Sequence, residues 1–138
     1  MNPDFEPISL EKSTQLHLQF EKRGGLLPVA VQESSSGKIL MLASINEAAF
    51  EHTLQTGMAT FFSTSRQQLW VKGETSGDFL RVDDIWVDCD QDAVVYQVTL
   101  LGEGVCHTFG PDWRHRKACF YRKLNPQKTE LSFLESTK

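Results

Sequence analysis

The sequence predicts a single α+β domain built mostly from antiparallel strands, with few helices. Short apolar segments with β-branched or aromatic residues recur along the chain, a pattern typical of strands. Clusters of Ser, Gly, Asn and Asp separate several of these segments, as they do in hairpins and turns. The 138 residues amount to one domain, in which 1–24 are an N-terminal extension and 125–138 a C-terminal tail.

The N-terminal part predicts a helix followed by a hairpin. Residues 8–20 have apolar positions at helical spacing, and Gly24 and Gly25 would end an amphipathic helix there. Residues 28–32 and 38–43 flank a Ser-Ser-Ser-Gly turn, and we expect them to pair as a β-hairpin.

A second helix and four further strands complete the prediction. Ser44 or Asn46 would cap a helix that runs through Leu54 and ends at Gly57. Residues 102–118 have the composition of a loop, and the C-terminal tail is polar and follows an Asn-Pro stop signal. The further expected strands are residues 59–63, 79–89, 93–101 and 119–124.

Composition excludes several classes of protein. With 40% apolar and 23% charged residues, the chain suits one buried core and is too polar to fill a membrane. It has no apolar run near the ~18 residues of a membrane helix and no apolar signal core at its start. The net charge of −4 argues against broad nucleic-acid binding but is compatible with a local basic pocket for one phosphorylated small molecule. Three cysteines are poor material for a disulfide framework, so we expect a cytoplasmic protein with a metal site.

Three aspartates at alternate positions form the most informative segment. In an extended strand Asp88, Asp90 and Asp92 would share one face, with Cys89 on the other. Their mutual repulsion would be relieved by a divalent cation, and carboxylate oxygens suit Mg²⁺ or Ca²⁺. An EF-hand loop does not fit, because the glycine and glutamate that it needs are missing. The alternative is a solvated acidic turn between two strands.

The cysteines and one histidine are a second candidate group. Cys89, Cys106 and Cys119 would supply three thiolates, which together with one open position make the ligand set of a catalytic zinc site. Zinc lowers the pKa of its bound water to about 7, and the adjacent His107 would then transfer protons. The alternative is that Cys89 and Cys119 are small buried apolar residues of their strands.

A polar and basic segment, residues 63–77, is a candidate phosphate-binding region. It combines Arg66 and Lys72 with several hydroxyls and glycines, the groups that bind phosphates. It is not a P-loop, because the required lysine pattern is absent. Trp70 would stack on a base or belong to the core, and the alternative for the whole segment is an ordinary surface loop.

The order of these motifs and the residues within them resemble the phosphoribosyl-AMP cyclohydrolase family from about Gly25 to Arg122. Two motifs, W-x-K-G-E-T-S-G at residues 70–77 and D-C-D-x-D-A at residues 88–93, are together highly specific for this family. The other matching motifs are Leu26-Leu27-Pro28, Leu40-Met41-Leu42-Ala43, Asn46-Glu47-Ala48, the S-x-S-R of Ser63 to Arg66, Cys106-His107-Thr108 and Cys119-Phe120-Tyr121-Arg122.

The resemblance implies an enzyme of histidine biosynthesis that opens the adenine ring of phosphoribosyl-AMP. Hydroxide would attack C6 and the N1–C6 bond would break. The resemblance also implies a homodimer whose subunits share the zinc ligands, with His107 as the general base. The implied zinc ligands are Cys89, Cys106 and Cys119, the implied magnesium ligands are Asp88, Asp90 and Asp92, and the implied substrate-binding residues are Arg66, Trp70, Lys72, Thr75 and Ser76.

The chain departs from the family pattern in two places. The family usually reads C-H-T-G-x-x-[SA]-C, whereas this chain has about six more residues between Cys106 and Cys119, an insertion that loop closure tolerates. The longer loop would bring Trp113, Arg114 and His115 to the pocket rim, with His115 as a spare ligand or base or as a solvated loop residue. The family often has an aromatic-Met-Asn where this chain has Ser-Ile-Asn. The alternatives are therefore a divergent paralogue that hydrolyses another purine nucleotide and a non-catalytic nucleotide- or metal-binding module.

Overall fold

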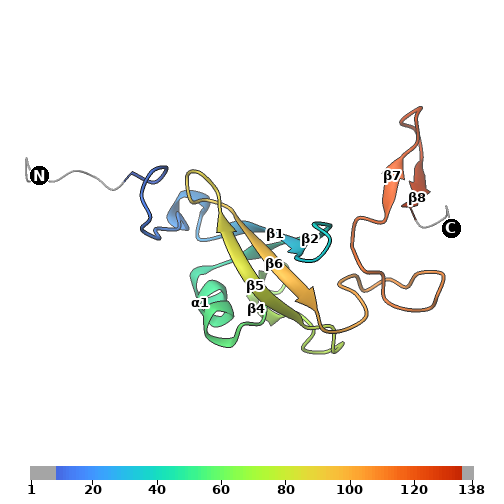
Figure 1. Cartoon of the computed structure of the whole chain (residues 1–138), viewed down its shortest axis with the longest axis horizontal. Coiled ribbons are helices and arrows are strands. Elements are labelled where there is room, and N and C mark those ends of the chain that lie inside the picture. The colour runs from blue at the N-terminus through green and yellow to red at the C-terminus, as the bar shows by residue number, and fades with distance from the viewer. Residues whose placement is uncertain (1–8, 135–138) are drawn as a thin grey trace, which may run out of the picture.

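The computed structural model describes residues 9–134, which form an α+β fold with a four-stranded sheet and two small hairpins (Figure 1). The strand order of the larger sheet is β2-β1-β6-β5. Its outer pairs are antiparallel, while β1 and β6 pair in parallel, so the predicted fold class of mostly antiparallel strands is confirmed. The strands are β1 (Leu27–Glu33), β2 (Ile39–Ile45), β5 (Leu80–Val87) and β6 (Val94–Leu100).

The predicted β1–β2 hairpin and the helix after it are both present. Helix α1 (Glu47–Thr56) begins at Asn46, whose side-chain oxygen accepts the N–H of Ala49 at 2.8 Å. The helix ends at Gly57, whose φ of 76° is the left-handed conformation that glycine adopts without strain. The cap is therefore Asn46, because Ser44 belongs to β2. Within the described residues, no helix is long and apolar enough to span a bilayer.

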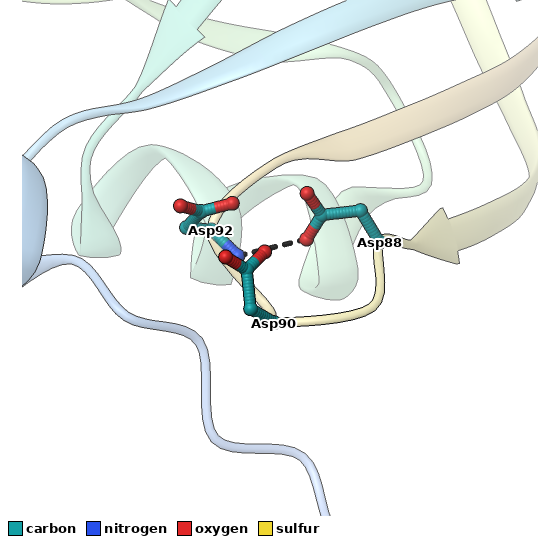
Figure 2. A group of neighbouring side chains, drawn as sticks. All are labelled: Asp88, Asp90 and Asp92. Carbon is teal, nitrogen blue, oxygen red and sulfur yellow. Dashed lines mark hydrogen bonds between the residues drawn. The ribbon is translucent and has the colours of Figure 1, made fainter. Parts of the chain in front are cut away.

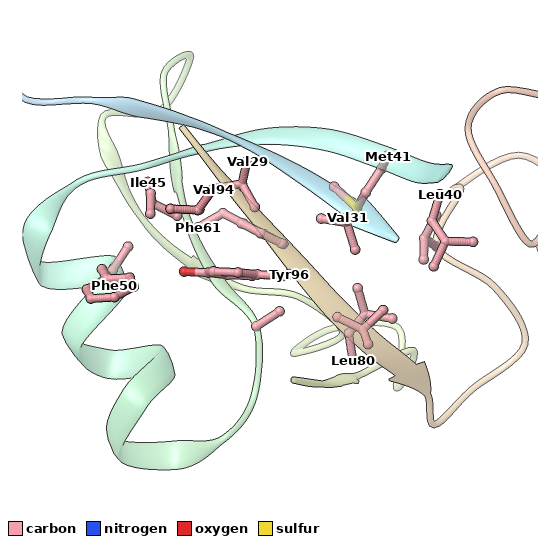
Figure 3. Close-up of a cluster of buried hydrophobic side chains, with 14 of the residues drawn as sticks. Val29, Val31, Leu40, Met41, Ile45, Phe50, Phe61, Leu80, Val94 and Tyr96 are labelled. Atoms are coloured by element: carbon pink, nitrogen blue, oxygen red, sulfur yellow. The ribbon is translucent and has the colours of Figure 1, made fainter. Parts of the chain in front are cut away.

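The core lies between the large sheet, helix α1 and the hairpin of β3 (Thr60–Ser63) and β4 (Gln68–Val71) (Figure 3). Tyr96 of β6 is fully buried and its ring stacks on Phe61 of β3, with 6.2 Å between ring centroids. The ring of Phe61 also contacts Trp70 of β4, with 5.6 Å between ring centroids. This packing fixes the β3–β4 hairpin, which carries much of the predicted basic segment, against the sheet.

The prediction of a helix at residues 8–20 is wrong for its described part, residues 9–20, which form turns and extended chain. Only the short 3₁₀ helix η1 (Glu21–Arg23) follows, and residue 8 lies outside the described residues. The physical reason is a distant partner: the Gln91 side chain accepts the N–H of His17 at 2.6 Å, and its carbonyl accepts the N–H of Gln19 at 2.8 Å. These bonds satisfy backbone groups without a helix.

The C-terminal tail also differs from its prediction. Strand β8 (Leu131–Phe133) lies within it and pairs antiparallel with β7 (Arg122–Leu124). Asn125 makes the turn, since its side-chain oxygen accepts the N–H of Thr129 at 2.9 Å. The predicted strand at 119–124 is correspondingly shorter, and residues 135–138 lie outside the described part.

Residues 102–118 form the predicted loop, and its two ends are tied together. The N–H of Val105 donates to Lys117 and the N–H of Cys106 to Arg116, at 3.2 and 3.1 Å. The N–H of Cys119 then donates to the carbonyl of Leu40 in β2 at 2.7 Å. The inserted loop therefore leaves and returns to the body of the protein beside two cysteines.

Candidate active site

A cleft of about 840 Å³ lies between the β3–β4 hairpin and the 102–118 loop. It brings together every residue that the sequence assigned to substrate binding, the predicted base and two of the three cysteines. These residues are Arg66, Trp70, Lys72, Thr75, Ser76, Cys106, His107 and Cys119.

The segment after β4 forms one wall of the cleft through a tight turn. The N–H of Gly77 donates to the carbonyl of Gly73 at 2.7 Å. Gly73 has a φ of 93°, and a Cβ there would overlap the backbone of Phe79, so no other residue fits without strain. The turn presents Thr75 and Ser76 at the cleft, next to Lys72.

Lys72 is the cation most enclosed by the cleft. The residue is only 6% exposed, and none of the described carboxylates forms an ion pair with its ammonium. Burial lowers the pKa of Lys72, while the nearby Asp78, Cys119 and Cys106 partly offset the effect. A desolvated cation without an ion pair is suited to bind an anionic ligand.

The thiols of Cys106 and Cys119 lie next to each other at the cleft. Partial desolvation and the adjacent Cys106 thiol raise the pKa of Cys119 to about 11, although the residue as a whole is exposed. The Sγ of Cys106 lies 2.9 Å from the hydroxyl of Thr108. Two adjacent thiols from the two ends of one loop can act as paired ligands for a soft metal ion.

Cys89 does not join them within one chain. It is exposed in the turn between β5 and β6, whereas the 102–118 loop follows the opposite end of β6 (Figure 1). The seven residues of β6 alone span about 20 Å. In the part of the chain that the structure describes, the only group of three metal-ligand residues with ligand atoms within 4.8 Å of one another is Asp88, Asp90 and Asp92.

The three aspartates lie in a turn, so their predicted placement on a strand face is wrong. Strand β5 ends at Val87, and the N–H of Asp88 donates to Ala93 at 3.0 Å, which closes the turn. The Asp88 carboxylate accepts the N–H of Asp92 at 2.9 Å, and Figure 2 shows the three side chains gathered around this bond. The turn alternative is correct for the backbone, and the turn still brings the carboxylates together.

Two cations from η1 already contact this acidic turn. Lys22 Nζ lies 3.0 Å from Asp90 and 2.9 Å from Asp92, and Arg23 lies 3.1 Å from Asp92. The hydrogen bond from Lys22 is the main reason that the pKa of Asp92 falls far below its usual value. Burial raises the pKa of Asp88 instead. A divalent ion at this turn would therefore have to compete with Lys22.

Sequence reasoning missed one pair at the cleft wall. The Nδ1 of His115 lies 2.6 Å from the Oδ2 of Asp78, and both residues line the cleft. The sequence offers His115 only as a spare ligand or base, and none of the candidate groups includes Asp78. Asp78 directly follows the W-x-K-G-E-T-S-G phrase, but no pattern connects it with a residue 37 positions later.

The cleft thus combines an enclosed cation and hydroxyls for an anionic ligand with paired thiols and imidazoles for metal and proton chemistry. These features define the class of site that is suited to a phosphorylated small molecule and whose thiols could hold a soft metal ion. The sequence model of phosphoribosyl-AMP cyclohydrolases matches residues 41–121, more than half of the chain. The chain belongs to the phosphoribosyl-AMP cyclohydrolase family, so the resemblance seen in the motifs is confirmed.

Curated relatives support the same family. The chain is 46% identical to the phosphoribosyl-AMP cyclohydrolase of Desulfatibacillum aliphaticivorans, over 82% of this chain and 86% of that protein. It is 48% identical to the phosphoribosyl-AMP cyclohydrolase of Desulfotalea psychrophila, over 80% of this chain and 83% of the relative. A histidine-biosynthesis bifunctional protein of Thermus thermophilus is 44% identical over 85% of this chain and 51% of its own length.

Proposed function

We propose that this chain opens the adenine ring of phosphoribosyl-AMP in histidine biosynthesis. Water adds to C6, the N1–C6 bond breaks, and a proton passes to the leaving nitrogen. The observation that carries the proposal is the cleft that joins Lys72, the Cys106–Cys119 pair and His107 in a member of this family.

The β3–β4 side of the cleft supplies the substrate contacts. Lys72 and Arg66 bind phosphate groups, and Thr75 and Ser76 donate hydroxyls to phosphate or ribose. Trp70 packs on Phe61 and also lines the cleft, so in this proposal its side chain contacts the nucleotide while it packs against the core.

His107 is the catalytic base in this proposal. It directly follows Cys106 and lines the cleft. From there its imidazole takes a proton from the attacking water and returns it to the nitrogen released from C6, which balances the reaction. Because His107 is exposed on the loop, its ring has room to take the proton from water and then to deliver it to the leaving nitrogen.

The donor set fits a zinc ion. Cys106 and Cys119 are adjacent, and a Cys119 pKa of about 11 means that a cation must displace the thiol proton at neutral pH. Cys106 and Cys119 of one chain and Cys89 of a second would hold the ion. When bound, zinc supplies hydroxide at neutral pH by lowering the pKa of its water to about 7.

The proposal includes a homodimer, because Cys89 lies apart from the other two cysteines of its own chain and a second copy would supply it. The β7–β8 hairpin extends away from the large sheet (Figure 1) and exposes Leu124 and Leu131, which are 57% and 54% exposed. Apolar side chains on a projecting hairpin favour packing against a second copy. The proposed dimer therefore shares its zinc ligands between subunits.

The acidic turn fits a magnesium ion, since its three carboxylates offer hard oxygen ligands within 4.8 Å of one another. Asp88, Asp90 and Asp92 would hold the ion after Lys22 moves away. When bound, magnesium neutralises these carboxylates and orients a phosphate group.

The charge and the cysteines of the chain bear on its ligand and its location. The net charge of −4 favours a small nucleotide over nucleic acid as the ligand. The three cysteines are free thiols, which supports a reducing, cytoplasmic compartment.

Purified protein of known zinc content, assayed against phosphoribosyl-AMP and a panel of other purine nucleotides, tests the proposed function. We expect turnover of phosphoribosyl-AMP that disappears on chelation and returns with zinc. Turnover of a different purine nucleotide would instead identify a divergent paralogue. Tight nucleotide binding with no turnover of any substrate would indicate a binding module.

A further inference from the structure

The Asp78–His115 pair is built into the cleft wall. The two side chains are 8% and 21% exposed, and the Asp78 Oδ1 also accepts the N–H of Glu103 at 2.8 Å. The ring of Phe109 lies 4.6 Å from the His115 ring. His115 is thus held on two sides, by a carboxylate and by an aromatic ring.

Two glycines make this arrangement possible. A Cβ at Gly102 would overlap the Asp78 side chain, and a Cβ at Gly104 would overlap the backbone of Arg116. The chain therefore approaches Asp78 and the inserted loop more closely than any larger residue allows. The loop is closed at its far end by the N–H of Gly110, which donates to Arg114 at 2.9 Å.

The contact with Asp78 determines which ring atom of His115 is free. A carboxylate only accepts hydrogen bonds, so Nδ1 carries the proton shared with Asp78. In the neutral ring Nε2 then has an available lone pair. No protein group within residues 9–134 bonds to Nε2, and the residue lines the same cleft as Lys72 and His107.

We propose that His115 contacts the nucleotide through Nε2, which accepts a hydrogen bond from a hydroxyl or amino group, and that Asp78 positions the ring. This inference rests on the function proposed above and adds a second imidazole to it. His107 transfers protons, whereas His115 binds the substrate equally in the ground and transition states. Loss of the His115 contact therefore raises KM and leaves kcat nearly unchanged.

Two substitutions separate substrate binding from a structural role. In His115→Gln, the amide end of the side chain reaches the position of Nε2 but loses the bond to Asp78. In His115→Asn, the amide replaces Nδ1 and keeps that bond, but nothing reaches the substrate. We expect KM for phosphoribosyl-AMP to rise about tenfold in His115→Asn and less than about threefold in His115→Gln.

The control is the same pair of substitutions at His17, which is exposed on the N-terminal segment. We expect these control substitutions to leave both KM and kcat unchanged. Zinc content should be equal in all variants. Calorimetry also compares the affinities of the two His115 variants for AMP without any turnover. It therefore tests the contact even if the wild-type protein fails to hydrolyse phosphoribosyl-AMP. The proposal would be overturned if only His115→Gln weakened nucleotide binding, if both variants weakened it equally, or if neither did.

Discussion

The ammonium of Lys22 lies 2.9 Å from the Oδ2 of Asp92, so η1 places a cation against the acidic turn between β5 and β6. The same ammonium lies 3.0 Å from Asp90. These contacts raise the pKa of Lys22, chiefly through its hydrogen bond to Asp92. The N-terminal segment and the proposed magnesium ion therefore compete for the same oxygens.

Replacing this cation should strengthen magnesium binding. In Lys22→Met we expect the affinity for Mg²⁺, measured by calorimetry, to rise about two- to tenfold, because exposed ion pairs contribute little each. Lys12→Met is the control, because Lys12 is an exposed lysine of the same segment that, among the described residues, forms no ion pair with the three aspartates. Weaker Mg²⁺ binding by Lys22→Met would show that the two cations do not compete.

The inserted loop is fastened to the end of β1 by an ion pair with a predictable pH dependence. Glu33 is buried and lies 2.8 Å from the ammonium of Lys117. Burial raises the pKa of Glu33, but hydrogen bonds from Lys117 and Ser36 outweigh it and leave the pKa lowered. Because the folded pKa lies below the unfolded value, the pair stabilises the protein above about pH 4.3 and loses its effect as pH falls.

Glu33→Gln should therefore reduce the free energy of unfolding by on the order of 1 kcal/mol at pH 7, with a smaller difference at pH 3. Thermal melts of both proteins between pH 3 and pH 7 measure this difference. A difference that grows toward pH 3 would mean that the pKa of Glu33 is raised instead.

We expect Lys72 to strengthen substrate binding and to lower the stability of the fold. Removing a desolvated cation that has no ion pair relieves a burial cost, so Lys72→Met should melt at the same temperature as the wild type or higher. Its KM for phosphoribosyl-AMP should rise at least about tenfold, because a phosphate loses a charged partner. A lower melting temperature with an unchanged KM would assign Lys72 to the fold alone.

Local patterns predicted those parts of the fold that local interactions determine. The β1–β2 hairpin follows from the turn between two apolar segments, and α1 follows from the Asn46 cap and the Gly57 end. The expected helix at 8–20 failed because Gln91, more than seventy positions away, binds its backbone. Strand β8 was missed because its partner β7 and the Asn125 turn are needed to order so short a segment.

The candidate site also has parts that local motifs predicted and parts that depend on distant contacts. Motif residues predicted most of the cleft, since Lys72, His107 and the Cys106–Cys119 pair all line it. The alternation of the aspartates suggested a strand, but Asp88 closes a turn with Asp92 through its carboxylate. The Asp78–His115 contact depends on how the inserted loop folds back, and residue spacing holds no information about that path.

Mixing two inactive variants tests the shared zinc site most directly. Cys89→Ala and Cys106→Ala should each lose zinc and activity. A dimer with one chain of each retains one complete site, built from Cys89 of one subunit and Cys106 and Cys119 of the other. Random reassociation of the unfolded chains should thus restore about a quarter of wild-type activity, together with bound zinc. No recovery in the mixture, or full activity of Cys89→Ala alone, would contradict a site that two chains complete.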